Sequence, residues 1–261
     1  MPLPQTRPIT RISIVSHGQA ELVRALLEDL AEWERDSDIQ VILTLNLPEA
    51  LPFDGGAYPF PLRIVRNDRP QGFGTNHNTA FRLAQPSGEF SYYCVLNPDI
   101  RLENGVIPAL RAILAAHPET GLIAPTVVNR EGIAENSARR LPTPLAILGK
   151  AIRLAVSGKL PVEPPLDQPH WVAGMFMLFP ARVFSAVGGF DEAYHLYYED
   201  VDLCCRLRLA GHDIRLAREA SVIHDARRSS HRSLRYMRWH LASMLRFFTS
   251  GVFLKCRLKL K

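Results

Sequence analysis

Short apolar runs alternate with longer stretches of helical period along the first half of this 261-residue chain. The runs are rich in β-branched residues, and five of them predict strands, at 12–16, 39–45, 62–66, 92–96 and 121–124. The longer stretches predict helices at 21–33, 75–84 and 104–117. Strands that alternate with helices of this length predict a mostly parallel sheet covered by helices on both faces.

The second half of the chain is less regular. The segment 139–169 contains six prolines around an apolar stretch at 145–156, and its length predicts a mobile functional insert rather than an ordinary loop. Beyond it, the pattern predicts strands at 171–179, 213–216 and 221–224 and helices at 181–187, 199–210 and 233–252. Gly211 is placed to end the helix before it.

An acidic run stands at the start of the helix predicted at 199–210. Glu199, Asp200 and Asp202 place three carboxylates within four residues, behind the apolar side chains at 196–198. Clustered like charges are costly to desolvate, so they suit work on a cation or a proton better than they suit a core. The alternative is an ordinary acidic first turn, which the helix macrodipole favours.

Composition and cysteine content are those of a globular intracellular protein. Hydrophobic residues make up 47% of the chain, and no uninterrupted apolar run reaches the roughly 18 residues of a membrane span. The N-terminus lacks the apolar centre of a signal peptide. Four cysteines without zinc-ligand spacing predict a reducing compartment; they are Cys94, Cys204, Cys205 and Cys256.

The net charge of +5 is unevenly distributed. Ten basic residues and no acidic residue lie in 226–261, so the first 225 residues carry 5 − 10 = −5. We therefore divide the chain into a main domain at 8–225 and a basic amphipathic helical tail at 226–261. The tail helix predicts contact with an anionic membrane surface; the alternative is a helix packed on the sheet with a solvated basic face.

Several polar residues follow predicted strands or open a predicted helix. Asp99 follows the strand at 92–96 and is a hard oxygen ligand suited to Mg²⁺ or Mn²⁺, or a turn residue. The glycines around Phe73 open a helix whose free N–H groups favour phosphate. Three asparagines offer amides to a base or a sugar; they are Asn67, Asn76 and Asn78.

Further candidates lie in the second half. His224 ends a strand, where it would complete a metal or diphosphate site or be an ordinary surface histidine. Trp171 and Gly174 would wall a sugar pocket or belong to the core. Asp200 is the candidate general base, with its pKa raised by the neighbouring carboxylates. Arg206, one helical turn from Asp202, is expected to pair with it.

Seven motifs occur along the chain in the order Ile14-Val15-Ser16-His17, Asn67 with Gly72-Phe73-Gly74 and Asn78, Asn97-Pro98-Asp99, Trp171 to Leu178, Gly188-Gly189-Phe190-Asp191-Glu192, Tyr197 to Leu203, and His224. In this order, they resemble the motifs of the inverting nucleotide-sugar glycosyltransferases of family 2, and most of all those of the bacterial rhamnosyltransferase-like members. The resemblance covers residues 10–230 and implies the GT-A fold, a single Rossmann-like domain.

The resemblance also implies roles for residues. Asp200 would be the catalytic base, and Asp99 with His224 would hold Mg²⁺ or Mn²⁺. The nucleotide-sugar site would comprise Ser16, His17, Asn46, Asn67, Gly72, Phe73, Asn78, Asn97, Trp171, Gly174 and Glu199. Asn97 stands where the family's metal motif has its first aspartate, and Asn46 follows the second strand, where the family often has an acidic residue.

The implied activity is transfer of a sugar to a saccharide or a polyprenyl-linked glycolipid in cell-surface polysaccharide synthesis. The donor would be a dTDP- or UDP-sugar, with dTDP-rhamnose preferred. The expected location is the cytoplasm, at the inner face of the cell membrane.

Other classes of protein remain as alternatives. A sugar-nucleotide nucleotidyltransferase would need a basic loop after the first strand, and 16–20 contains no Arg or Lys. A nucleic-acid-binding protein would use the basic tail but would leave the acidic run without a purpose. We therefore expect no nucleic-acid partner. The asparagine at position 97 also makes an inactive relative conceivable.

Overall fold

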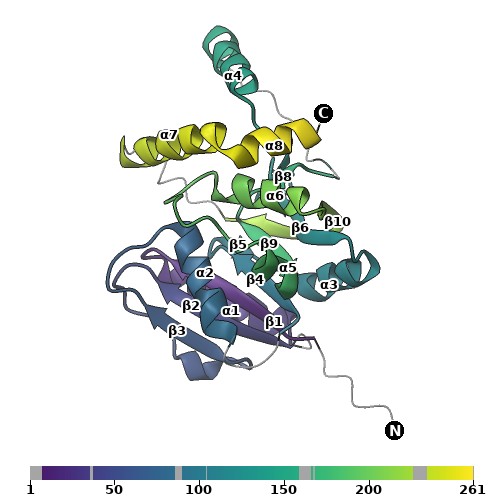
Figure 1. Ribbon diagram of the computed structural model, residues 1–261. Helices are drawn as coiled ribbons and strands as arrows, with labels where there is room; N and C mark the ends of the chain where they lie inside the picture. The colour runs from purple at the N-terminus through teal and green to yellow at the C-terminus, as the bar shows by residue number, and fades with distance from the viewer. Residues whose placement is uncertain are drawn as a thin grey trace.

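A single eight-stranded sheet organises the chain (Figure 1). The computed structural model describes residues 8–35, 38–85, 90–103, 105–158, 166, 168–225 and 234–260. The strand order is β3-β2-β1-β4-β9-β6-β10-β5. These strands are β1 (Thr10–Ser16), β2 (Ile39–Leu45), β3 (Leu62–Arg66), β4 (Tyr92–Leu96), β5 (Ile100–Arg101), β6 (Thr120–Val128), β9 (Phe176–Pro180) and β10 (Asp213–His224).

Six of the eight strands run in the same direction, as predicted. β1 pairs in parallel with β2 and β4, β2 pairs in parallel with β3, and β10 pairs in parallel with β6. β9 and β5 are antiparallel to their neighbours. The carboxyl ends of the six parallel strands therefore lie along one edge of the sheet, where ligands bind in open α/β folds.

The predicted strands differ from the structure in two places. The apolar run at 171–179 contains two strands, because the chain turns at 173–175. Its first part, β8 (Trp171–Val172), pairs with β7 (Ala138–Arg139) outside the main sheet. The strands predicted at 213–216 and 221–224 are both parts of β10, which bulges between Ala217 and Ser221.

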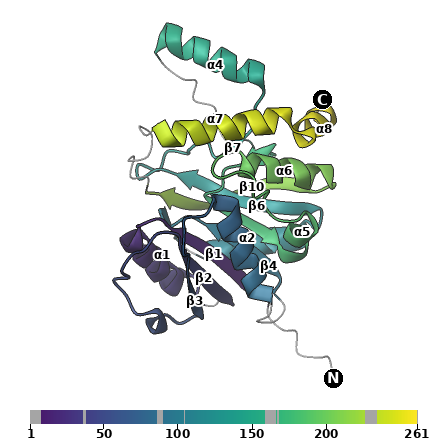
Figure 2. The same ribbon diagram turned by 60° about the vertical axis from the view of Figure 1, so that its left-hand side comes forward.

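Helices cover both faces of the sheet (Figure 2). On one face, α1 (Ala20–Trp33) and α3 (Val106–Ala116) bury leucine and isoleucine side chains against the central strands. On the other face lie α2 (Phe73–Ala84), α5 (Ala181–Ala186) and α6 (Glu199–Leu209). The short helix η1 (Gly55–Ala57) precedes β3. This three-layer arrangement is the predicted α/β architecture.

The C-terminal segment forms two helices rather than the single one predicted. They are α7 (Leu234–Thr249) and α8 (Gly251–Lys259), separated at Ser250, whose Oγ accepts a hydrogen bond of 3.1 Å from Phe253 N. Aromatic side chains of both helices pack on the outer side of α6. The predicted domain boundary at 225/226 adjoins 226–233, which lies outside the described residues.

The predicted proline-rich insert contains one helix, α4 (Pro144–Ser157), in its described part. The positions 159–165 and 167 lie outside the described residues. None of the helices in the described ranges has the length and apolar content of a membrane-spanning segment.

A fully buried histidine lies between α2 and the sheet. Ser13 Oγ lies 2.8 Å from His77 Nδ1, and the Tyr93 hydroxyl donates to the His77 carbonyl oxygen. Burial penalises the imidazolium form and lowers the pKa of His77 to about 3. The folded protein therefore holds this side chain neutral.

This neutral imidazole makes stability depend on pH. Below a pKa of about 6.5 the unfolded chain protonates His77, whereas the folded chain does so only near pH 3. The unfolded state then holds more protons, so we expect the free energy of unfolding to fall by up to about 1.4 kcal/mol for each pH unit below 6.5. Urea unfolding at a series of pH values measures this slope.

The control for this experiment separates His77 from other histidines. His77→Gln should flatten the slope, while His212→Gln, in the partly exposed turn before β10, should retain it. An unchanged slope in H77Q would show that another group is responsible.

Candidate active site

Polar residues from the ends of three neighbouring strands meet at the carboxyl edge of the sheet. Ser16 ends β1 and His17 follows it, Asn46 follows β2, and Asn67 follows β3. Asn46 Nδ2 lies 3.2 Å from His17 Nδ1, and Asn67 Nδ2 donates to Asn46 Oδ1 at 2.7 Å. The fold therefore brings together these four residues, which the sequence separates by 51 positions.

The amides form a network that extends to the start of α2. Asn67 also donates to Asn76 Oδ1 at 2.7 Å, while Asn46 accepts from Gln71 N and donates to Gln71 O. Amides carry both donors and acceptors, the combination that reads a nucleobase edge. Gln71 takes part through its backbone, so its residue type carried no signal in the sequence.

Gly72 allows the 194–195 loop to approach the start of α2 closely. A Cβ at this position would lie 2.8 Å from His195 O, so only glycine permits the approach. Phe73 N donates to the same oxygen at 2.9 Å. The expectation that this helix start offers its N–H groups to phosphate is wrong for Phe73, because a loop carbonyl already occupies that N–H.

Asn78 lies away from the other candidate residues. Its side chain is buried, donates to Phe190 O at 2.8 Å and to Glu192 Oε1 at 3.0 Å, and accepts from Phe190 N at 2.9 Å. Gly189 leaves room for it, since a Cβ there would lie 2.4 Å from Asn78 Oδ1. The amide is committed to holding the 189–192 loop, so the expected contact with the nucleotide is corrected to a structural role.

Asp200 lies in the first turn of α6, facing the turn between β8 and β9. Gly174 N donates to Asp200 Oδ2 at 3.2 Å and Val201 N donates to Asp200 Oδ1 at 2.8 Å. Gly174 also touches Phe73, because a Cβ on it would lie 3.0 Å from that ring. Phe73, Gly174 and Asp200 are thus brought together from three separate segments.

Burial raises the pKa of Asp200, and the N–H groups of Val201 and Gly174 and the charge of Arg139 oppose that shift. The predicted direction of the shift is confirmed, with burial as its largest cause, and the charge of Asp200 in turn raises the pKa of the buried Glu199. Asp202 forms an ion pair with Arg206, in which Arg206 Nε lies 2.7 Å from Asp202 Oδ2, as the sequence predicted. Arg206 Nη1 also donates to Val187 O at 2.6 Å, which fixes the pair to the body.

The backbone that leads into α6 is strained. Tyr197 and Tyr198 both have positive φ, at 70° and 67°, and they are the only described non-glycine residues in this region of the map. Such strain persists only where surrounding structure determines it, and Tyr198 packs on Phe247 of α7. Glu199, next in sequence, is buried, and no described hydrogen-bond partner reaches its Oε2.

A second cluster lies at the ends of β4 and β10. His224 Nε2 lies 3.3 Å from Asp99 Oδ2, and its Nδ1 lies 2.9 Å from Glu135 Oε2. The hydrogen bond and charge of Asp99, together with those of Glu135, raise the pKa of His224 to about 9. Glu135 was missed by the sequence analysis because it lies in a loop without a motif.

The two clusters share the carboxyl edge of the sheet. Asn97, between β4 and Asp99, donates its N–H to Met175 O at 2.9 Å, and Met175 follows Gly174. Trp171 lies three residues before Gly174, with its Nε1 donating to Arg140 O at 2.9 Å and the Arg139 guanidinium 5.2 Å from its ring centroid. Trp171 therefore belongs to the same short segment that holds the candidate base.

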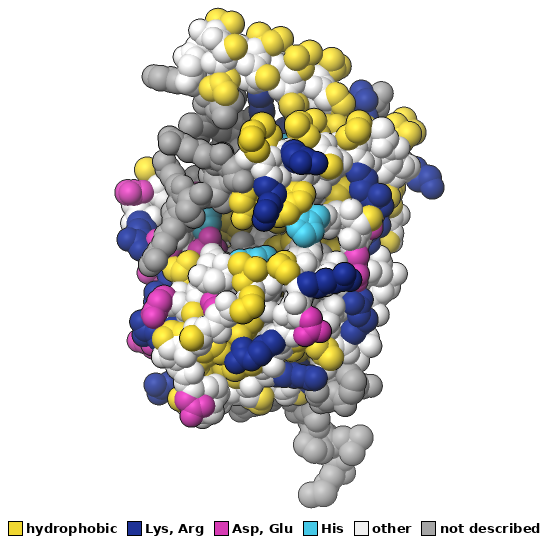
Figure 3. Space-filling view, turned by 90° about the vertical axis from the view of Figure 1, so that its left-hand side faces the viewer, with side chains coloured by type: hydrophobic (Ala, Val, Ile, Leu, Met, Phe, Trp, Pro, Cys, Tyr) yellow, Lys and Arg dark blue, Asp and Glu magenta, His cyan; other side chains and the backbone are white. Residues whose placement is uncertain are grey.

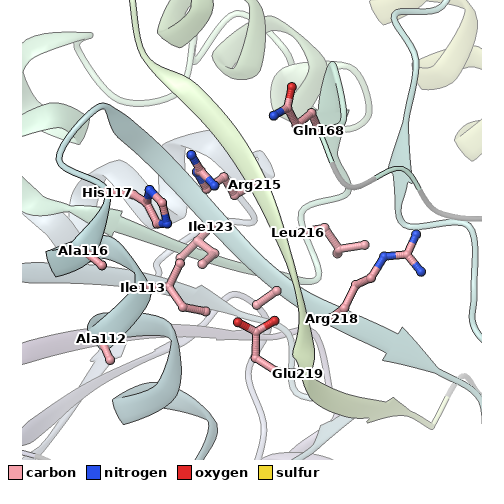
Figure 4. Close-up of a pocket in the computed structure, with 11 residues that line it drawn as sticks. Ala112, Ile113, Ala116, His117, Ile123, Gln168, Arg215, Leu216, Arg218 and Glu219 are labelled. Atoms are coloured by element: carbon pink, nitrogen blue, oxygen red, sulfur yellow. The ribbon is translucent and has the colours of Figure 1, made fainter.

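A cavity between α3 and β10 lies away from these residues. It has a volume of about 530 Å³ (Figure 4). Its lining includes Ile113, Ile123 and Leu216, together with Arg215, which pairs with Glu119. None of the predicted site residues lines this cavity.

The chain is similar to known glycosyltransferases, although no family model matches it. It is 27% identical to the rhamnosyltransferase WbbL of Escherichia coli over 244 residues, 90% of this chain and 91% of the relative. It is 29% identical to an N-acetylglucosaminyl-diphospho-decaprenol L-rhamnosyltransferase of Mycobacterium tuberculosis (strain H37Rv) over 66% of this chain, and this match spans 61% of that relative.

Solved structures give the same fold. A mannosyltransferase of Pyrobaculum calidifontis, in complex with GDP-Man and Mn²⁺, superposes with a TM-score of 0.60 at 16% identity, over 93% of this chain and 66% of that one. The fold is the GT-A fold. The chain is a nucleotide-sugar-dependent glycosyltransferase, and its sequence is similar to the rhamnosyltransferase-like members of family 2.

The contact between Gly174, Phe73 and Asp200 gives a prediction. Gly174→Ala keeps the N–H that holds Asp200 but forces the Phe73 ring to move by a few tenths of an ångström. Because small displacements of reacting groups are costly in rate, we expect sugar transfer to fall by about 10–100-fold with little change in melting temperature.

The matched control is Gly149→Ala in α4, where nothing lies near the added methyl group. A transfer assay with both variants measures the difference. Equal rates for G174A and wild type would contradict a close-fitting site here.

Proposed function

We propose that this protein transfers rhamnose from dTDP-rhamnose, with inversion, to a hydroxyl of a saccharide or polyprenyl-linked saccharide in cell-surface glycan synthesis. The observation that carries the proposal is the Asp200 carboxylate, fixed by Gly174 on the sheet edge that also holds Asp99 and His224. The donor is inferred from two relatives named as rhamnosyltransferases, and the lipid-linked acceptor from the mycobacterial one.

Asp200 acts as the general base in this proposal. An acceptor hydroxyl must lose its proton as it attacks the anomeric carbon, and a carboxylate within hydrogen-bond reach accepts it. The raised pKa makes Asp200 a stronger proton acceptor than an exposed aspartate once it is ionised. Attack from the side opposite the nucleotide displaces the leaving diphosphate in one step, which inverts the configuration.

The amide network at the sheet edge would bind the nucleotide. Asn46 and Asn67 can match the carbonyl and N–H groups of a thymine or uracil, with Ser16 and His17 beside them. Their present hydrogen bonds to each other would be exchanged for bonds to the base. Phe73 and Trp171 would bound the sugar on either side of Gly174.

Asp99 and His224 would hold the divalent cation, Mg²⁺ or Mn²⁺, and His224 would release the proton that Asp99 and Glu135 favour on it in the metal-free protein. Among the described residues no hydrogen-bond partner reaches the buried Asp99 Oδ1, which leaves an oxygen suited to a hard cation. The described ranges contain no group of three His, Cys, Asp or Glu side chains arranged to hold a metal ion, so diphosphate oxygens would complete the shell. The cation would stabilise the negative charge of the departing nucleoside diphosphate.

We propose that α7 contacts the inner, anionic face of the cell membrane. Ser243 and Phe247 are buried against the body, whereas Met237 is 54% exposed. The other exposed large apolar residues of α7 are Leu234, Leu241 and Leu245. Basic residues near an anionic leaflet contribute about 1 kcal/mol each.

Replacing Asp200 tests the base. In Asp200→Asn we expect donor binding to remain and transfer to fall by about 10²–10⁴-fold, because the amide cannot accept the proton. A thermal shift with dTDP-rhamnose measures binding, and product formation measures transfer. Asp213→Asn, at the exposed start of β10, serves as the control, and a D200N enzyme at the wild-type rate would remove Asp200 from this role.

Replacing Asp99 tests the metal site. We expect Asp99→Asn to abolish the extra thermal shift that Mn²⁺ adds to nucleoside diphosphate binding, because the amide oxygen carries no charge for the cation. Glu219→Gln, an exposed carboxylate of β10, should keep that shift. An unchanged Mn²⁺ response in D99N would place the cation elsewhere, and an enzyme inactive with every donor and metal would support an inactive relative.

A further inference from the structure

The helix of the proline-rich segment, α4, stands apart from the rest of the protein. It lies beyond α7, on the side away from the sheet, in both ribbon views (Figures 1 and 2). None of its residues is buried, and Leu145 and Val156 are 75% and 82% exposed. Isolated helices of this length are marginal in water, so a helix in this position calls for a partner surface.

The ends of α4 are nonetheless well defined. Thr143 Oγ1 accepts from Ala146 N at 3.2 Å, Pro144 occupies the first turn, and Gly158 ends the helix with a positive φ. These are the standard start and stop signals of a stable helix. The sequence therefore specifies a helix here while leaving its apolar side chains exposed.

The exposed apolar residues of α4 and α7 follow the same spacing. Apart from Leu154, which is 45% exposed and lies outside this row, those of α4 are Leu145, Leu148, Ile152 and Val156, and those of α7 are Leu234, Met237, Leu241 and Leu245. Each set is separated by three, four and four residues, which places its members along one face of a helix. Figure 3 shows hydrophobic side chains along both helices, with Lys and Arg side chains among those of α7.

The net charge of the segments that contain α4 and α7 indicates which kind of surface can bind their exposed apolar faces. Between Glu135 and Glu163 there are five basic residues and no acidic one, as there are ten and none in 226–261. The two segments carry 5 + 10 = +15, and the rest of the chain carries 5 − 15 = −10. A second copy of this face would meet like charge, whereas an anionic lipid surface complements it.

The root of α4 is attached to the candidate active site. The chain enters the helix from β7, whose Arg139 pairs with Trp171 of β8, and Leu141 N donates to His170 Nδ1 at 3.0 Å. Two residues beyond β8, Gly174 holds Asp200. A surface that binds α4 would therefore lie near the side of the protein where the acceptor would reach Asp200.

We propose that α4 inserts its apolar face into an anionic lipid bilayer beside α7, as a second membrane-contacting helix. This inference rests on the proposed function, since α4 would be a second attachment to the membrane that α7 is proposed to contact. The positively charged residues around both helices would lie among the lipid headgroups, and the apolar rows would enter the acyl boundary.

Vesicle sedimentation of the full chain tests the proposal. The vesicles contain phosphatidylcholine with or without phosphatidylglycerol. We expect Leu148→Gln/Ile152→Gln to lower the partition coefficient on phosphatidylglycerol vesicles by at least about tenfold, because two side chains no longer leave water. The same change at Trp33 and Ile133, exposed apolar residues outside this face, should leave binding unchanged. Circular dichroism of both variants checks that helix content is retained.

A parallel pair in α7 separates the inference from the proposed function. If Leu241→Gln/Leu245→Gln releases the protein but the α4 pair does not, α4 has no membrane role and the proposal for α7 stands. If the wild type fails to bind phosphatidylglycerol vesicles, both membrane proposals fall. Neither double substitution should change the rate of sugar transfer to a water-soluble acceptor. This rate therefore tests the transferase activity separately from membrane binding.

A fluorescent probe distinguishes the bilayer from a protein partner. Val156→Cys, labelled with an environment-sensitive dye, should shift to shorter wavelength on addition of phosphatidylglycerol vesicles. A shift that depends on protein concentration without vesicles would show self-association through α4 and would overturn the proposal. No shift under either condition would also overturn it.

Discussion

The parallel register of the central strands is the constraint on which the rest of this structure depends. Because β1, β2, β3, β4, β6 and β10 point the same way, every loop that follows them opens on one edge. Asn46, Asn67, Asp99 and His224 are far apart in sequence, yet each follows or ends such a strand. The antiparallel β9 begins at that same edge, and so it brings Gly174 to Asp200.

Close backbone packing then sets the distances within the site. Gly72 admits the carbonyl of His195, and Gly174 admits the ring of Phe73 and leaves its N–H to the Asp200 carboxylate. A side chain at either position would push apart segments that the site requires together. The strained Tyr197 and Tyr198, held by the aromatic packing of α7, turn the chain so that α6 begins with its carboxylates at this junction.

Charge divides the molecule into two parts with different surroundings. The acidic body holds carboxylates that are buried, paired with arginine or placed beside His224. The segments that contain α4 and α7 have the opposite net charge, and leucine side chains of both helices remain exposed. In the proposed function a water-soluble donor and a lipid-linked acceptor would be used side by side, and the short pair β7 and β8 joins the two parts of the chain.

The sequence by itself determined the α/β architecture and the Asp202–Arg206 pair, because these depend on local periodicity and on neighbours one helical turn apart. Its motif order also showed the similarity to glycosyltransferases. Only the tertiary structure decided the rest. Asn78 resembles a ligand-binding amide in sequence, yet it anchors the loop at 189–192. Glu135 has no motif, yet it contacts His224. The exposure of α4 was likewise hidden, since an apolar helix has the same sequence pattern whether a core or another surface covers it.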